Sequence, residues 1–116
     1  MKRILVVDDV VANRMLLNAY LENPNYEVVE AEDGEQAVKK AEEKDFDLIL
    51  MDMDMPIMNG YEASSKIKHE MKKDTPIIIC TASVEDNGSW KEHGIDGFYT
   101  KPILAETIGE ITNKYL

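Results

Sequence analysis

Short runs of apolar residues alternate along the chain with longer stretches in which apolar residues recur at helical spacing. The short runs are ILVV at 4–7, YEVVEA at 26–31, LILM at 48–51, PIIIC at 76–80 and FY at 98–99. They are rich in Val and Ile and almost continuously apolar, which is typical of strands buried on both faces of a parallel sheet. The pattern therefore predicts five strands.

The stretches between the short runs predict helices, because their apolar residues recur at every third or fourth position. A helix should follow each of the first three strands, and a last helix should follow the fifth strand. The predicted buried faces are Ala12, Met15, Leu16 and Ala19; Ala37, Val38 and Ala41; Ala63, Ile67 and Met71; and Leu104, Ile108, Ile111 and Tyr115.

The helix expected between the fourth and fifth strands is the weakest element. The sequence SVEDNGSWKEHG has Asn87 and Gly88 in its middle and little apolar periodicity beyond Val84 and Trp90. We expect this helix to be short or mobile. Strands and helices otherwise alternate throughout, which implies right-handed crossovers. This order indicates a doubly wound α/β fold, with a five-stranded parallel sheet and helices on both faces.

The composition is that of a single globular domain, which we expect to span residues 1–116. The net charge of −10 and the pI near 4.6 oppose attraction to nucleic acid or to anionic membranes, because both need a positive field on the protein. The opening sequence MKRILVVDD begins like a signal peptide, but Asp8 ends its apolar run too early. No apolar stretch approaches the length of a membrane span.

Cys80 is the only cysteine of the chain, so no intrachain disulfide can form. It lies inside the apolar run PIIIC, where a buried thiol is the ordinary interpretation. A protein without disulfides fits a reducing compartment. We therefore expect a cytoplasmic protein with no nucleic-acid or membrane partner.

Polar side chains stand where the predicted strands end. Asp8 and Asp9 follow the first strand, Asp52 the third, Thr81 the fourth and Lys101 the fifth. In an open α/β sheet, ligands bind outside the carboxyl ends of the strands, where the strand order reverses. These residues are therefore candidates for one functional site.

Each candidate also has a purely structural interpretation. Asp9 could be only the N-cap of a helix that starts near Val11, Thr81 could be a cap as well, and Lys101 could be a solvated turn residue. Asp52 fits such an interpretation poorly, because carboxylates are depleted in strands and seldom buried unless paired. The five residues together at one edge favour function.

The residue types indicate a chemistry. Three carboxylates gathered at one point repel one another, so they must take up protons or bind a cation, and hard oxygen ligands suit Mg²⁺. An aspartate can serve as a nucleophile that forms an aspartyl phosphate, while Mg²⁺ and a lysine neutralise charge on a transferring phosphoryl group. The hydroxyl of Thr81 could then bond a phosphoryl oxygen.

Four motifs built on these residues occur in order: VVDD, LILMDMDMPIMNG, CTA and YTKP. With them, the chain resembles the receiver domain of two-component response regulators over essentially its whole length. The resemblance implies a flavodoxin-like strand order of 2-1-3-4-5. It also implies that Asp52 is the phosphoacceptor, and that Asp8, Asp9 and Asp52 hold Mg²⁺ together with the backbone carbonyl of Asp54.

The resemblance also implies a switch. Lys101 would contact the phosphoryl group, and the Lys101–Pro102 peptide would be cis. Thr81 would move towards the phosphoryl oxygen, and the aromatic residue Phe98 would turn inward with it. Asp54 and Ser83 occupy positions that tune the dephosphorylation rate in the family.

The function implied is that of a response-regulator receiver in a phosphorelay. The chain would take a phosphoryl group from a phosphohistidine on a histidine kinase or a histidine phosphotransfer protein, and lose it by hydrolysis. It would act through a downstream protein or an output domain of a parent chain. It would be a signalling switch and not an enzyme, since it would catalyse only its own phosphorylation and dephosphorylation.

Two departures from the family pattern concern the switch. The segment from Thr81 to Lys101 is shorter than is common, which puts in doubt the use of the fourth-helix face for output. Phe98 replaces the commoner tyrosine, and Tyr99 stands beside it.

Three alternatives remain open from the sequence. A degenerate receiver would act only as an interaction module. A haloacid-dehalogenase-type phosphatase would use the two aspartates of DMD, although Pro56 stands where that family has Thr or Val. A Cu(I) site could use the thioethers of MDMDMPIM, although most methionines in such positions fill space in the core.

Overall fold

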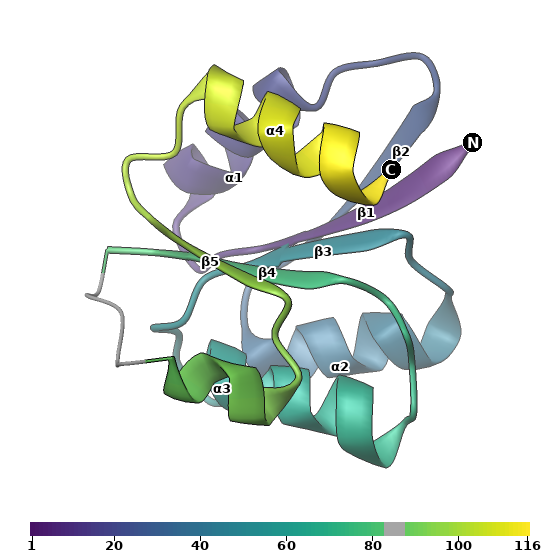
Figure 1. The fold of residues 1–116 in the computed structure, drawn as a ribbon, viewed down its shortest axis with the longest axis vertical. Coiled ribbons are helices and arrows are strands. Elements are labelled where there is room, and N and C mark those ends of the chain that lie inside the picture. The colour runs from purple at the N-terminus through teal and green to yellow at the C-terminus, as the bar shows by residue number, and fades with distance from the viewer. Residues whose placement is uncertain (83–87) are drawn as a thin grey trace.

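The structure is a computed structural model that describes residues 1–82 and 88–116. Five strands alternate with helices along the chain (Figure 1). The elements are β1 (Lys2–Val7), α1 (Val11–Tyr20), β2 (Tyr26–Ala31), α2 (Gly34–Glu43), β3 (Leu48–Met51), α3 (Gly60–Ser65) with a π-helical continuation η1 (Lys66–Glu70), β4 (Ile77–Thr81), a 3₁₀ segment η2 (Ser89–His93), β5 (Gly97–Thr100) and α4 (Ala105–Tyr115).

The five strands form one parallel sheet in the order β2-β1-β3-β4-β5, which confirms the predicted fold class and strand order. The register places the last residues of the strands side by side: Val7 pairs with Ala31 and Met51, and Thr81 pairs with Thr100. The carboxyl ends of all five strands therefore reach the same edge. The predicted bounds of β2 and β3 are confirmed, and those of β1, β4 and β5 shift by one or two residues. Thr81 is therefore the last residue of β4 and does not follow it.

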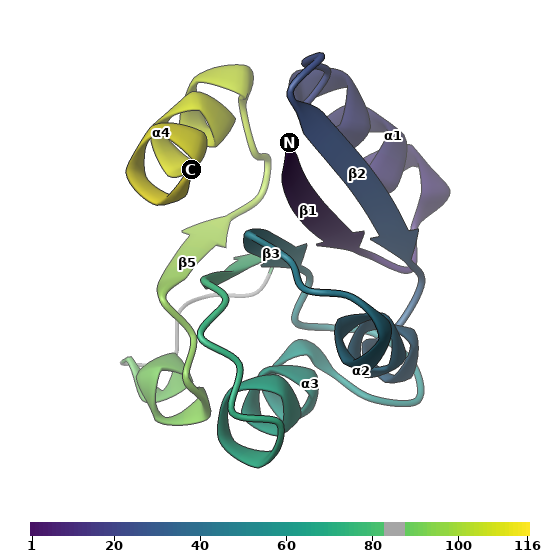
Figure 2. The ribbon, with the colours of Figure 1, turned by 90° about the vertical axis from the view of Figure 1, so that its right-hand side faces the viewer.

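Helices cover both faces of the sheet, with α1 and α4 on one side and α2, α3 and η2 on the other (Figures 1 and 2). Successive strand residues alternate between the two faces, which explains why the strands are apolar throughout. Leu5, Ile49 and Ile79 pack with α2 and α3, whereas Ile4 and Leu50 pack with α1 and α4. These central side chains are fully buried.

The predicted buried faces are confirmed for α2 and for the α3–η1 helix, where Ala37, Ala41, Ala63 and Ile67 are buried. The face predicted for α1 is wrong, because Ala12, Met15, Leu16 and Ala19 are exposed. The buried residues of α1 are Arg14 and Leu17, followed by Leu21. Their spacing is also helical, but an arginine in that row made the neighbouring, wholly apolar row look like the core face.

In α4, Ile108 and Ile111 are buried as predicted, but Leu104 is exposed and is the N-cap of the helix. Ile103 takes its place in the core.

The predicted fourth helix falls partly outside the described residues, which leave out Ser83, Val84 and Asn87. The described part is the short segment η2, bounded by Gly88 and Gly94 with φ of 84° and 79°. A side chain at Gly94 would also meet the Lys68 side chain at 2.7 Å. Within residues 1–82 and 88–116, no helix combines the length and apolar composition that crossing a membrane requires.

Candidate functional site

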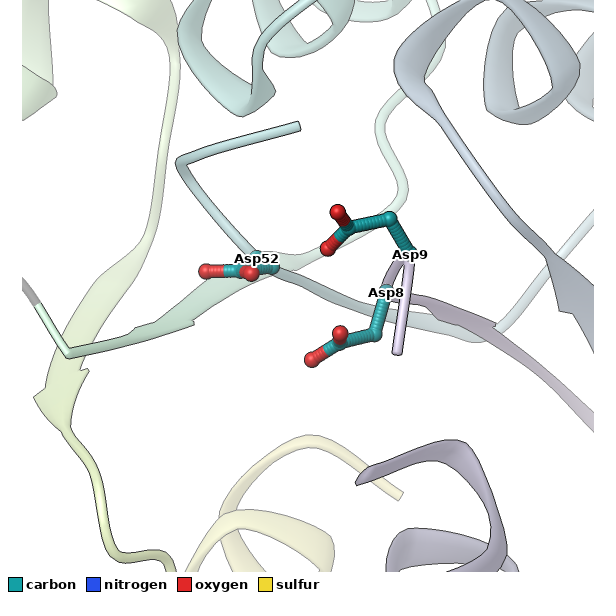
Figure 3. Close-up of side chains that lie close together, drawn as sticks. All are labelled: Asp8, Asp9 and Asp52. Carbon is teal, nitrogen blue, oxygen red and sulfur yellow. The ribbon is translucent and has the colours of Figure 1, made fainter. Parts of the chain in front are cut away.

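Three aspartates gather at the carboxyl edge of the sheet (Figure 3). Asp8 and Asp9 follow β1, Asp52 follows β3, and one carboxylate oxygen of each lies within 4.8 Å of the others. Asp8 and Asp52 are buried, at 1% and 8% exposed, whereas Asp9 is exposed. The group therefore has an inner pair of carboxylates and one that faces solvent.

Asp8 is held by several hydrogen bonds. Its backbone N–H donates to the carbonyl of Ala31 at 3.2 Å, and its Oδ1 accepts from the backbone N–H of Val10 at 2.9 Å. Helix α1 begins after the N-cap Val10, which makes no side-chain capping bond. The N-cap interpretation of Asp9 is therefore wrong, and its carboxylate is available for another role.

Lys101 lies between the two buried carboxylates. Its Nζ is 2.8 Å from Asp8 Oδ2 and 3.5 Å from Asp52 Oδ2. The Lys101–Pro102 peptide is cis. The Lys101 N–H donates to the carbonyl of Thr81 at 2.7 Å, and this hydrogen bond holds the backbone from which the Lys101 side chain extends. Lys101 is therefore not a solvated turn residue.

The charges of this group shift its pKa values. Burial raises the pKa of Asp52, the positive charge of Lys101 opposes this, and the negative charge of Asp8 adds to the rise. Burial would lower the pKa of Lys101, but its bonds to Asp8 and Asp52 outweigh burial and raise it. Asp52 thus prefers a proton or a cation more than an ordinary aspartate does.

Thr81 and Asp54 lie beside the acidic group. Thr81 is fully buried, and its Oγ1 donates to Asp54 Oδ2 at 3.4 Å. Its hydroxyl also interacts with Asp52, which lowers the pKa of that carboxyl. Thr81 is thus in reach of both aspartates of the DMD motif.

Phe98 is half-buried on β5 and packs against the core on the α2 and α3 side. Its ring lies 6.2 Å from that of Trp90 in η2, centroid to centroid. The contact joins β5 to η2.

The donor set fits Mg²⁺. Carboxylate oxygens are the hard ligands that Mg²⁺ takes in proteins, and the exposed side of Asp9 leaves room for the waters it usually keeps. The thioethers of Met53, Met55 and Met58 instead pack against the core, as space-filling methionines do. The site is thus suited to a hard divalent cation.

Three residues near the site were missed in the sequence. Asn59 and Glu62 form a capping box that starts α3 after the loop from Asp52, and the N-x-x-E pattern could have revealed it. Arg14 is buried at 7% exposure, and its Nη1 donates to the carbonyl of Asp8 at 2.7 Å. No sequence signal distinguishes Arg14 from a surface arginine.

Comparison with known proteins places this geometry in a family. The sequence profile of the response regulator receiver domain matches residues 4–113. The transcriptional regulatory protein ResD of Bacillus subtilis is 44% identical over 108 residues, which cover 91% of this chain and 44% of ResD. The sensor protein GacS of Pseudomonas syringae is 35% identical over 119 residues, covering 97% of this chain and 13% of GacS. The chain thus spans less than half the length of these curated relatives.

Solved structures show the same fold. The response regulator TrrA of Thermotoga maritima, in complex with Mg²⁺ and BeF, superposes with a TM-score of 0.89 at 35% identity over 100% of both chains. The chemotaxis response regulator CheY4 of Vibrio cholerae gives a TM-score of 0.89 at 31% identity, over 100% of this chain and 99% of that one.

Proposed function

This chain belongs to the response regulator receiver domains of two-component systems, and we propose from this premise that it accepts a phosphoryl group on Asp52 with the help of Mg²⁺. The observation that carries the proposal is the convergence of Asp52 with Asp8, Asp9 and Lys101 at one edge of the sheet. Incubation with acetyl phosphate should add one phosphoryl group to the intact mass, and only when Mg²⁺ is present.

In the proposed transfer, a carboxylate oxygen of Asp52 attacks the phosphorus of a phosphohistidine. The O–P bond forms as the N–P bond breaks, and the imidazole leaves with the bonding electron pair and takes up a proton. The ammonium of Lys101 neutralises charge on the equatorial oxygens, and the Thr81 hydroxyl donates to one of them. Mg²⁺ would be held by Asp8, Asp9, Asp52 and the backbone carbonyl of Asp54, and supplies further positive charge.

The proposed switch uses the neighbours of Thr81. In the structure its hydroxyl donates to Asp54, and a phosphoryl group on Asp52 would offer a more strongly charged acceptor. Movement of Thr81 would leave space beside β4, into which the half-buried ring of Phe98 would turn. Because Phe98 contacts Trp90, the change would reach η2.

We assign the chain the role of a switch that catalyses only its own phosphorylation and dephosphorylation. The phosphatase alternative places its DxD motif on a first strand, whereas Asp52 follows β3 in a receiver fold. The full set of Asp8, Asp9, Asp52, Thr81 and Lys101 supports an active receiver over a degenerate one.

The asymmetry of the acidic group gives a test of the proposed metal site. Asp9→Asn should weaken Mg²⁺ binding about tenfold without unfolding the chain, because it removes one charge from an exposed position. Titration calorimetry measures the affinity. Asp33→Asn is the control, because Asp33 is not part of the acidic group and asparagine keeps a side-chain oxygen to cap α2. This variant should bind Mg²⁺ as the native chain does. Equal affinity for native and Asp9→Asn would remove Asp9 from the site.

The phosphoryl donor is proposed to be a phosphohistidine of a histidine kinase or of a histidine phosphotransfer protein. Relatives include sensor kinases as well as transcriptional regulators, which supports either setting. Output would pass to a downstream protein or to a further domain of a parent chain. We propose that residues 1–116 form one domain and, in view of the single buried thiol of Cys80, that it works in the cytoplasm.

Exposed apolar side chains beside the site support docking of such a donor. Val11, Met15 and Leu16 on α1 are 46–65% exposed, and Leu16 lines a cavity of about 280 Å³ that also contains Asp8 and Lys101. A donor protein that presents its histidine to Asp52 would cover this surface.

Met15→Glu should therefore slow transfer from a phosphorylated histidine donor about tenfold, because a charge would replace apolar contact area on α1 at a residue that does not line this cavity. Its reaction with acetyl phosphate should be unchanged, since that small donor needs no docking surface. Rapid-quench assays with both donors measure the two rates. Ala19→Glu, also exposed on α1 but farther along the helix, is the control. Equal slowing with both donors would show damage to the site and not to docking.

A further inference from the structure

Arg14 is a buried charge that the transfer chemistry does not use. It stands on α1 and is only 7% exposed. A buried arginine is costly unless its donors are paired. The Arg14 guanidinium reaches three oxygens from two parts of the chain: the Asp8 carbonyl at 2.7 Å, Glu30 Oε1 at 2.9 Å and Glu32 Oε1 at 3.7 Å. It thus ties the segment after β1 to the end of β2.

The bond to Asp8 acts on the peptide that joins Asp8 to Asp9. The carbonyl of Asp8 and the N–H of Asp9 belong to one planar peptide group. Fixing the orientation of that carbonyl therefore also fixes the position of the Asp9 Cα. On its other side, Asp8 donates its own N–H to Ala31. Asp9 has an exposed side chain, so this peptide plane is the main restraint that the described contacts place on it.

The shape of the guanidinium suits this task. Its N–H groups lie in a rigid plane and point in different directions, so one group can bond a carbonyl and a carboxylate together. A lysine ammonium at the same place would keep the positive charge, but it lacks this fixed, planar fork of N–H groups. Glu30 and Glu32 also balance the charge of Arg14, so the cation does not oppose a metal at the acidic group.

We propose that Arg14 is a positioning residue for the acidic site: its bond to the Asp8 carbonyl fixes the segment that presents Asp8 and Asp9. Its consequence for Mg²⁺ affinity rests on the proposed function, but the restraint on the segment itself does not. Arg14→Lys separates the two roles of the residue, because it keeps the charge and removes the fork.

Hydrogen exchange without metal tests the restraint. In Arg14→Lys, the protection of the Asp8 and Val10 amides should fall about tenfold, because both amides depend on the placement of Asp8. The amides of Ile4 and Ile49 in the central strands should keep their protection. A uniform fall at all four amides would show a merely structural role and overturn the proposal.

Arg3→Lys is the matched control. Arg3 lies in β1, bonds a carboxylate of β2 (Glu27) and donates to a backbone carbonyl (Asp45) at 3.1 Å, but at the opposite end of the strand from Asp8. Arg3→Lys should leave the hydrogen-exchange protection of the Asp8 and Val10 amides unchanged. An equal loss of protection at these amides in Arg3→Lys would contradict the proposal.

Mg²⁺ titration tests the functional consequence. Arg14→Lys should weaken Mg²⁺ affinity about tenfold, and Arg3→Lys should stay within about twofold of native. If Arg14→Lys does not fold, Glu30→Gln, which loosens the guanidinium but leaves it in place, should weaken affinity about threefold. Native-like affinity in the folded variant overturns the positioning role. Absence of Mg²⁺ binding by the native chain instead overturns the proposed function, while the exchange result still decides the restraint.

Discussion

Asp52→Asn should accept no phosphoryl group from acetyl phosphate and should fold into a chain more stable than the native one. An amide is not a nucleophile for phosphorus, so the acceptor oxygen is lost. The gain in stability, about 1 kcal/mol without metal, follows because the variant buries no carboxylate beside Asp8. Intact mass measures the adduct, and urea denaturation in the presence of a chelator measures the free energy of unfolding.

The gain in stability of Asp52→Asn over the native chain should depend on pH. Because burial raises the pKa of Asp52 in the folded chain, the folded state holds this proton more tightly than the unfolded state. The stabilisation from this group is present below the unfolded pKa and is lost as pH rises through the folded pKa. The difference between Asp52→Asn and the native chain should therefore be small in acid and reach its full size at neutral pH.

Asp54→Asn is the control for this substitution. Asp54 is exposed and lies two residues away, so the same change there should still allow one adduct. An adduct on Asp52→Asn, or its loss on Asp54→Asn, would move the acceptor away from residue 52.

Lys101→Met should slow phosphorylation by acetyl phosphate about 100-fold at saturating Mg²⁺. The ammonium stands between Asp8 and Asp52, where negative charge builds up in the transfer, and removing one such group from an enclosed site costs about 10²- to 10³-fold. Mg²⁺ affinity should not fall, because the variant removes a competing cation from the same carboxylates. The time course of intact mass measures the rate.

Lys68→Met is the matched control for Lys101→Met. Lys68 is also largely covered and forms an ion pair of 2.7 Å with Asp96. This pair lies at the amino ends of β4 and β5, at the opposite edge of the sheet from Asp52. Its loss should lower stability and leave the phosphorylation rate within about twofold of native. Equal slowing in the two variants would show that loss of stability, and not loss of charge at the site, causes the effect.

Much of the site could be predicted because the sheet is buried on both faces. A strand that is covered on both faces stays apolar until it reaches the edge of the sheet. Asp52 and Asp8 are the first polar residues after LILM and ILVV, so both could be predicted to lie at that edge. The strand order and the cis Lys101–Pro102 peptide came from the family resemblance, and both are confirmed.

The buried face of α1 could not be predicted, because the pattern treats arginine as a solvent residue. Arg14 is buried only since the carbonyl of Asp8 and the carboxylate of Glu30 lie within its reach, and Glu30 is distant in sequence. The pattern assigns Met15 and Leu16 to the core because both are apolar. The sheet instead covers the adjacent row of α1, which holds Arg14 and Leu17.

The proposed function requires that Asp52 itself carries the phosphoryl group. The most direct test is to phosphorylate the native chain with acetyl phosphate and Mg²⁺, reduce the acyl phosphate with borohydride, and locate the resulting homoserine by peptide mass spectrometry. We expect homoserine at residue 52 alone, and none when Mg²⁺ is chelated. Homoserine at residue 8, 9 or 54, or at no position of a chain whose mass shows the adduct, would contradict the proposed function.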